Sequence, residues 1–130
     1  LEDFRLALTE IKRVLKPGGV FRAVLPDLEV LINDYIDNKK PGASCAFMKD
    51  TSLGVETRPK GLLAKFRSLF GNSNHLWMWD YKGISQELLD VGYTEIRRAC
   101  FNDSDIVDFK DIEDFERWNK CLGIQCIKPL

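Results

Sequence analysis

The chain has 130 residues, 45% of them hydrophobic, which is enough for one globular domain with a core of its own. Its 19 basic and 20 acidic residues leave a formal net charge of −1, so no overall electrostatic field attracts nucleic acid or an anionic membrane. We therefore expect a single domain over residues 1–130 and no nucleic-acid partner.

Cysteine and histidine are too few and too scattered for a covalent or metal-bound framework. The four cysteines form no C-x-x-C pair, and the chain has a single histidine. We therefore predict reduced thiols that pack as small core side chains, and no bound metal. No apolar run approaches the roughly 20 residues of a membrane span, and the N-terminal residues do not resemble a signal peptide, so a cytoplasmic location is expected.

The N-terminal part of the chain is predicted to form an α/β unit. Apolar residues recur at helical spacing over residues 4–15, and Pro17-Gly18-Gly19 ends this helix with a sharp turn. Residues 20–25 are apolar except for Arg22, a pattern typical of a strand that is covered on both faces. The expected fold class is therefore α/β.

A second helix and an insertion follow this strand. Pro26 ends the strand, and Asp27 is placed to cap a helix that ends near Asn38. Proline and glycine interrupt the pattern over residues 39–74, which we interpret as an insertion. Its one amphipathic helix, over residues 60–70, has basic residues opposite leucines and phenylalanines, so it rests on a membrane, binds a lipid-like acceptor or packs on its own domain.

The C-terminal half is predicted to contain one more helix and two strands. Asp80 is placed to cap a helix that ends at Gly92. Residues 93–101 are rich in β-forming residues but carry three charges, which favours the edge of a sheet, and residues 122–127 form the last strand. The acidic segment between them is expected to be a solvated loop that runs into a short helix ending near Trp118, with the two strands antiparallel.

Two parts of the sequence resemble class I S-adenosylmethionine-dependent methyltransferases that act on small molecules. Residues 7–27, with L-K-P-G-G as their most specific element, are similar to the segment after the fourth strand of that family. His75-Leu76-Trp77-Met78-Trp79-Asp80 and Leu88-Leu89-Asp90-Val91-Gly92-Tyr93 are similar to its H-x-W-M-Y-D segment and its L-L-x-x-A-G-F helix end. The resemblance implies methyl transfer by in-line displacement, and a partial Rossmann-like fold that begins after the cofactor-binding strands.

The sequence departs from the family where the cofactor would bind. It has no glycine-rich turn after a first strand and no acidic residue after a second, so we assign no cofactor-binding residue, although the intact enzyme is expected to use S-adenosylmethionine. The family's strand order further implies that residues 20–25 lack a neighbouring strand. The chain is then a fragment of a longer enzyme, which we favour, or it pairs through this edge with a second copy or with a separate cofactor-binding half.

The resemblance also implies which residues face the methyl acceptor, a small or lipid-like molecule. In the family, the residues just past the fifth strand line the substrate side of the active site. We predict His75 as the catalytic residue, acting on an acceptor hydroxyl or amine. The predicted substrate-binding residues are Pro26, Asp27, Tyr35, Trp77, Trp79 and Asp80, and the insertion over residues 39–74 is expected to form part of a cap over the substrate.

Each of these residues also has a purely structural interpretation. The imidazole of His75 is as well explained by a hydrogen bond within its loop, and Asp27 and Asp80 are better explained as helix caps than as catalytic groups. Trp77, Trp79 and Tyr35 fit either a pocket wall or the core. The rival to an enzyme is a non-catalytic module that binds a partner or oligomerises through its open strand edge.

Overall fold

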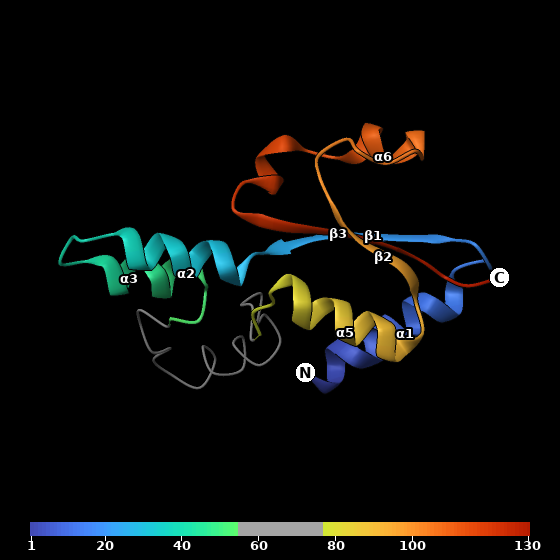
Figure 1. Ribbon diagram of the computed structural model, residues 1–130, viewed down its shortest axis with the longest axis horizontal. Coiled ribbons are helices and arrows are strands. Elements are labelled where there is room, and N and C mark those ends of the chain that lie inside the picture. Colours follow the sequence, from blue (N-terminus) through green and yellow to red (C-terminus); the bar gives the residue numbers. More distant parts are fainter. Residues whose placement is uncertain (55–76) are drawn as a thin grey trace, which may run out of the picture. The chain divides into compact units, whose positions relative to one another are not determined.

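The computed structural model of the chain describes residues 1–54 and 77–130, which form α-helices and one sheet (Figure 1). The elements are α1 (Glu2–Val14), β1 (Val20–Pro26), α2 (Leu28–Asp37), α3 (Ala43–Asp50), α5 (Tyr81–Val91), β2 (Thr94–Ala99), α6 (Val107–Ile112), the 3₁₀ helix η1 (Phe115–Trp118) and β3 (Cys121–Ile127). They fall into two compact units: residues 1–30 with 79–130, and residues 31–78. The predicted insertion over residues 39–74 falls inside the second unit.

The sheet of the first unit has three strands in the order β1-β3-β2. The central strand β3 is antiparallel to both neighbours, so β1 and β2 run parallel to each other. The predicted antiparallel pairing of the last two strands is confirmed, as is the position of β2 at an edge. Among the described residues, β1 forms the other edge.

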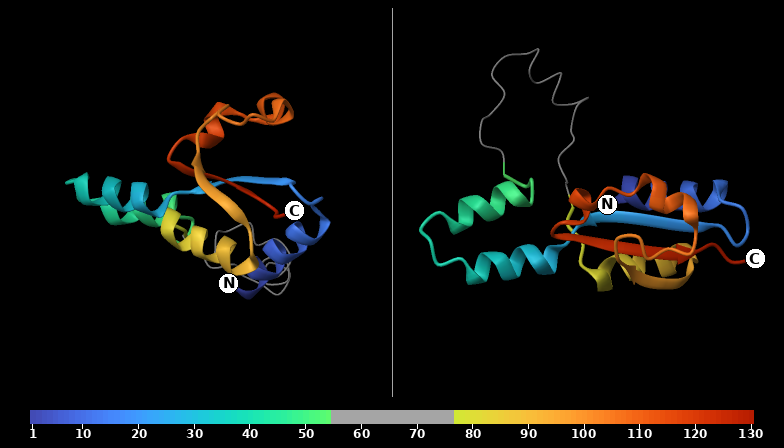
Figure 2. Two further views of the ribbon diagram at one scale, coloured as in Figure 1. Left: turned by 45° about the vertical axis from the view of Figure 1, so that its right-hand side comes forward. Right: turned by 90° about the horizontal axis from the view of Figure 1, so that it is seen from above.

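Helices α1 and α5 cover one face of this sheet, and the α6–η1 segment lies over the other (Figures 1 and 2). Alternation along β3 explains the first layer, because every second side chain of the strand points to the helices. Those side chains pack with the inward faces of α1 and α5, where helical spacing gathers the apolar residues. The buried cluster consists of Leu8, Trp79, Ile84, Leu88, Tyr93, Leu122, Ile124 and Cys126.

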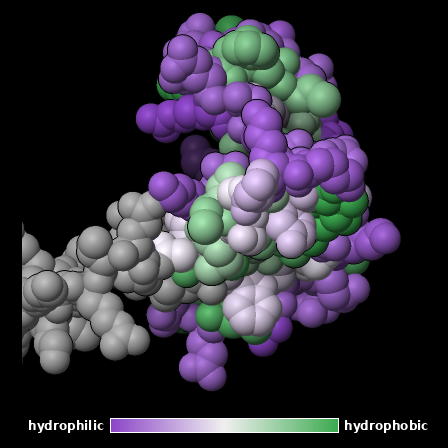
Figure 3. Space-filling model, turned by 90° about the vertical axis from the view of Figure 1, so that its left-hand side faces the viewer, coloured by the Kyte–Doolittle hydropathy of each residue, from purple (hydrophilic) through white to green (hydrophobic). Residues whose placement is uncertain are grey.

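The opposite face of β1 differs from the prediction. Phe21 and Leu25 pack against the core, but on the other face Val24 is 36% exposed, so that face is covered only in part. The side chain of Arg22 is only 3% exposed, because the segment between β2 and β3 folds over it. That segment presents hydrophobic atoms among hydrophilic ones on its outer surface, at the top of Figure 3.

Helix boundaries in the first unit follow the capping residues of the sequence. The Asp27 side chain accepts a hydrogen bond from the Glu29 N–H at 2.9 Å, and Asp80 accepts one from the Gly83 N–H at 2.7 Å. Gly92 ends α5 with φ of 88°, a left-handed conformation that glycine adopts without strain. The predicted caps of α2 and α5 are therefore confirmed.

The described part of the second unit contains a helix that the sequence pattern did not reveal. Helix α3 covers part of the range we interpreted as irregular, and it begins directly after Pro41 and Gly42. The Phe47 ring lies 5.5 Å from that of Tyr35 on α2, measured between centroids. The helix predicted over residues 60–70 lies outside the described residues. No helix within the described ranges has the length and apolarity to cross a bilayer.

Candidate functional site

The two segments that resemble the methyltransferase family meet just beyond the end of β1. Asp27 forms an isolated parallel bridge with Trp79, and the Leu28 N–H donates to the Trp79 carbonyl at 3.0 Å. Since β1 and β2 run parallel, their carboxyl ends lie at the same edge of the sheet, which is where open α/β sheets bind ligands. This edge is the candidate site.

The carboxylate of Asp27 is buried and fully engaged at this edge. The residue is 3% exposed, and one carboxylate oxygen caps α2. The other carboxylate oxygen lies 3.5 Å from a guanidinium nitrogen of Arg98, which extends from β2. The carboxylate of Asp27 therefore holds the start of α2 and the guanidinium of Arg98 in place, which is a positioning role.

Arg98 connects Asp27 to the solvent-exposed part of the site. Its guanidinium also pairs with Glu29 at 3.0 Å and lies 4.7 Å from the centroid of the Tyr81 ring. The side chain is about half exposed, so its remaining N–H groups are accessible to a ligand. We refer to Asp27, Glu29, Tyr81 and Arg98 as the Arg98 cluster. Its chemistry suits the binding of polar ligand atoms beside an aromatic face.

A thiol lies next to this cluster but is not activated. Cys121 pairs with Pro26 across the sheet. Burial, and the nearby negative charge of Asp27, raise the pKa of the Cys121 thiol. The thiol is therefore protonated near neutral pH, and only the thiolate is a strong nucleophile. The site does not support covalent catalysis by this cysteine.

The remaining predicted site residues are distributed between the two units. Trp79 belongs to the core, with its ring 4.9 Å from that of Phe4, and Asp80 caps α5. Tyr35 and Trp77 belong to the second unit, where both are exposed. His75 lies outside the described residues. The structure therefore brings Pro26, Asp27, Trp79 and Asp80 together within one unit.

Sequence reasoning missed four residues of the site, which are Glu29, Tyr81, Arg98 and Cys121. A signal existed for Arg98, because a charged residue near the end of a β-rich segment is unusual unless it pairs. No local pattern indicated that β3 would place Cys121 beside Pro26, since that contact depends on strand pairing. The four cysteines also correct a prediction, because only Cys126 is buried, while Cys45 and Cys100 are exposed.

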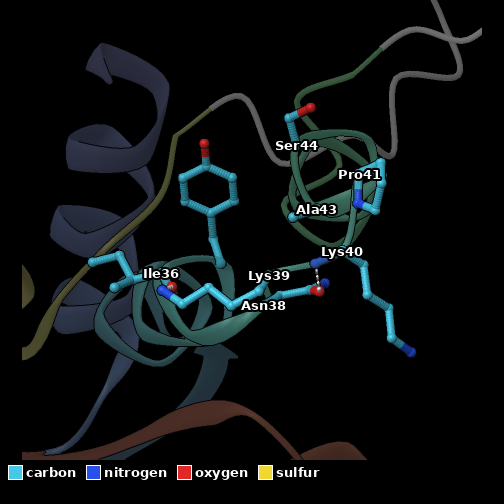
Figure 4. A pocket seen from close by; sticks show the side chains of 8 residues that line it. Ile36, Asn38, Lys39, Lys40, Pro41, Ala43 and Ser44 are labelled. Atoms are coloured by element: carbon cyan, nitrogen blue, oxygen red, sulfur yellow. Dashed lines mark hydrogen bonds between the residues drawn. The ribbon is translucent and has the colours of Figure 1, made fainter.

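A cavity of about 340 Å³ opens in the second unit between α2 and α3 (Figure 4). Its polar side chains do not converge on a ligand. The Lys39 ammonium donates to the Ile36 carbonyl at 2.6 Å, and the Asn38 side chain accepts the Lys40 N–H at 3.1 Å. The Lys40 side chain points away from that of Ser44 in Figure 4. This cavity therefore has weaker support as a binding site than the edge beyond β1.

Comparison with known proteins does not assign a family or a function to the chain. No family model, no curated protein and no solved structure matches the chain. Within residues 1–54 and 77–130, no group of three or more histidine, cysteine or acidic side chains is arranged to hold a metal ion. The functional argument therefore depends on the residues of the site and on the family resemblance alone.

Proposed function

We propose that this chain forms the acceptor-binding side of a class I S-adenosylmethionine-dependent methyltransferase. The observation that carries the proposal is the bridge between Asp27 and Trp79, because it joins the two family-like segments at the carboxyl edge of the sheet. In this proposal the fold is the C-terminal part of a Rossmann-like methyltransferase. The acceptor is a small or lipid-like molecule.

The direction of the strands supports this fold. Strand β1 is followed in the chain by helices and then by β2, which runs parallel to it. Helix α5, which precedes β2, packs on the sheet, as the helix of a β-α-β crossover does. No other described strand pairs with the outer edge of β1. The family's missing neighbouring strand would pair there.

The described residues do not fit a cofactor cradle. The close glycine pair of the chain has no free amides to offer, because the Gly18 N–H donates to the Lys128 carbonyl at 2.9 Å and the Gly19 N–H to the Lys16 carbonyl at 2.8 Å. This turn also precedes a strand, whereas a dinucleotide-type cradle follows one. The cofactor-binding part of the enzyme is therefore proposed to lie outside the described residues.

Within the proposal, the Arg98 cluster orients the acceptor. Asp27 and Glu29 hold the guanidinium of Arg98, and the side of that group open to solvent binds polar atoms of the acceptor. Asp80 and Trp79 fix the position of α5 and of Tyr81 at its start. His75 keeps the catalytic role that the family resemblance implies, and Tyr35 and Trp77 keep their implied roles as substrate-binding residues.

The test separates acceptor binding from cofactor binding. In the longest gene product that carries this sequence, transfer of a tritiated methyl group to an extract of small molecules is measured. Arg98→Gln is expected to raise the KM for the acceptor about tenfold and to leave the KM for S-adenosylmethionine unchanged. Arg13→Gln, at an exposed ion pair on α1, is the control and is expected to alter neither value.

Calorimetric titration of this chain with S-adenosylmethionine tests the other half of the proposal. We expect no binding tighter than about 1 mM, because the described glycine pair is already hydrogen-bonded. Micromolar binding to the chain alone would contradict the assignment of the cofactor site to another part of the enzyme. Equal effects of Arg98→Gln on both KM values would contradict the role of Arg98.

A second candidate function is a non-catalytic module that pairs with a partner strand. The outer edge of β1 favours this function. Backbone hydrogen bonds to β3 alternate along the strand, so the N–H and C=O groups of Val20, Arg22 and Val24 are directed away from β3. A second copy or a separate N-terminal half would supply the strand. Light scattering coupled to gel filtration measures the mass in solution, and a monomer at all concentrations would exclude pairing of two copies.

A further inference from the structure

The outer surface of the α6–η1 segment combines exposed apolar side chains with acidic ones. Val107, Ile112 and Phe115 are 67%, 76% and 69% exposed, and Ile106 is also exposed. The acidic side chains on the same segment are Asp105, Asp108, Asp111, Asp114 and Glu116, and all are exposed. We call these nine residues the α6–η1 surface; the segment that carries them lies at the top of Figures 1 and 3. Single exposed apolar residues need no explanation, but a group of them rimmed by charge marks an interaction site.

The inner side of this segment is anchored, so the exposure is not that of a fraying loop. Arg22 is buried beneath it and pairs with Asp103 at 2.8 Å and with Glu113. The guanidinium of Arg22 also lies 5.1 Å from the centroid of the Trp118 ring. A buried arginine with two carboxylate partners fixes the segment against the sheet, since separation would leave charges unpaired. The outward side chains are therefore presented on a fixed support.

An aromatic group also holds the exposed Phe115 in place. The Phe101 ring packs edge-on against Phe115 and against Trp118, with centroid distances of 5.4 and 6.3 Å. Gly123 of β3 leaves the space that the Trp118 ring occupies, because a Cβ at this position would collide with that ring. One part of the Phe115 ring is thus packed while most of its surface stays in water, which is the arrangement of an anchor residue at an interface.

Charge identifies the chemistry of the occupant. The five exposed carboxylates of the surface are opposed by two exposed basic residues of the segment, Lys110 and Arg117, which leaves a local charge of −3 (2 − 5). A second copy of the chain would bring like charges together, and an anionic bilayer would be repelled. We propose that the α6–η1 surface binds a basic amphipathic segment of a partner protein. The proposal is independent of the methyltransferase function.

The binding test uses a peptide probe of defined chemistry. A fluorescein-labelled helix-forming peptide of about 14 residues, with leucine at helical spacing and lysine elsewhere, is titrated with this chain and followed by anisotropy. We expect a micromolar Kd that weakens as salt rises from about 50 to about 500 mM. A peptide with glutamate in place of lysine is expected not to bind.

Surface variants decide whether the peptide binds where we propose. Ile112→Ser and Phe115→Ser are each expected to raise the Kd about tenfold, and Asp108→Asn combined with Asp111→Asn to raise it only at low salt. The matched control is Leu6→Ser, at a similarly exposed position on α1, with unchanged Kd. Circular dichroism verifies that each variant is folded. A Kd weaker than about 1 mM, or an equal loss with Leu6→Ser, would overturn the proposal.

Two further measurements address other occupants. Analytical ultracentrifugation is expected to show the same mass for the wild-type chain and Phe115→Ser, whereas a dimer lost only in that variant would overturn the proposal in favour of a second copy. Sedimentation with vesicles of phosphatidylcholine and phosphatidylserine is expected to show no binding. Vesicle binding that Phe115→Ser abolishes would overturn it in favour of a membrane.

Discussion

The two edge strands of the sheet are built differently, although both pair with β3 and run in the same direction. Strand β2 is irregular, with a register shift between Thr94 and Arg97 and a φ of 51° at Glu95. Its outward charges come from Glu95, Arg97 and Arg98. Strand β1 pairs with β3 at every position from Val20 to Pro26 without a shift.

The two edges therefore differ in how readily a further strand can pair with them. A bulge and charged side chains twist and protect an edge, and β2 has both. Strand β1 is regular and mostly apolar, and the one charge it carries, Arg22, is buried under the α6–η1 segment. Arg97 and Arg98 thus place partly exposed charge on the edge strand β2, whereas the arginine of β1 is buried. The regular edge of β1 is the one suited to a partner strand.

Replacing the two arginines tests this contrast most strongly. Arg22→Met is expected to lower the free energy of unfolding by about 3–5 kcal/mol, because it removes the buried partner of Glu113, whose carboxylate is 9% exposed, and one of the two arginine partners of Asp103. Arg97→Met removes a more exposed pair and is expected to cost about 1 kcal/mol or less. Urea unfolding followed by tryptophan fluorescence measures both. Equal losses would contradict the different roles of the two residues.

Enlarging Gly123 disturbs the strand between the two edges. A Cβ at this position would collide with the Trp118 ring and with the Ala99 carbonyl oxygen on β2. Gly123→Ala is therefore expected to destabilise the fold by about 1–3 kcal/mol, measured by urea unfolding. Gly42→Ala is the control, since no atom lies within 4 Å of the added methyl group. A neutral Gly123→Ala would show that Trp118 moves freely.

Lowering the pH is expected to remove the stabilisation by Asp103, a carboxylate that contacts both edge strands. Asp103 pairs with Arg22 of β1 and with Arg97 of β2. Burial raises the pKa of Asp103, but hydrogen bonds from Arg97, the Cys100 N–H and Arg22 outweigh it and lower the pKa from 3.8 to about 2. Because the folded-state value is depressed, this stabilisation is complete above about pH 4 and is lost as the pH falls through about 2.

The measurement is the urea midpoint between about pH 5 and about pH 2. The wild-type midpoint is expected to fall over this range more steeply than that of Asp103→Asn. Asp105→Asn, at an exposed carboxylate, is the control and is expected to follow the wild type. Parallel curves for the wild type and Asp103→Asn would contradict the bridging role of Asp103.

The smallest expected effect on stability comes from a charge placed on the open edge. Val24→Lys, at a partly exposed position of β1, is expected to change the free energy of unfolding by about 0.5 kcal/mol or less. It is expected to slow aggregation on mild heating, as measured by light scattering, because lysine on an edge strand blocks strand addition. Glu95→Lys on β2 is the control. Equal aggregation rates in all three proteins would show that β1 is not the reactive edge.

The sequence by itself determined the longer helices and the strands of the first unit, but not α6, which lies where a loop was predicted. Helical spacing located α1 and α5, and Asp27, Asp80 and Gly92 marked caps that the structure confirms. These features depend on contacts between residues a few positions apart, so they can be predicted from a single sequence. Helix α3 was missed because Pro41 and Gly42 gave turn signals and its apolar face is short.

Only the tertiary structure decided which residues meet. The sequence placed Pro26, Asp27, Trp79 and Asp80 near a proposed site, but it did not reveal that Arg98 pairs with Asp27. It predicted a strand covered on both faces, whereas a later segment covers Arg22 and leaves Val24 of the same face 36% exposed. Such contacts join residues far apart in the chain, and their energy depends on burial and strand order, which no local pattern records.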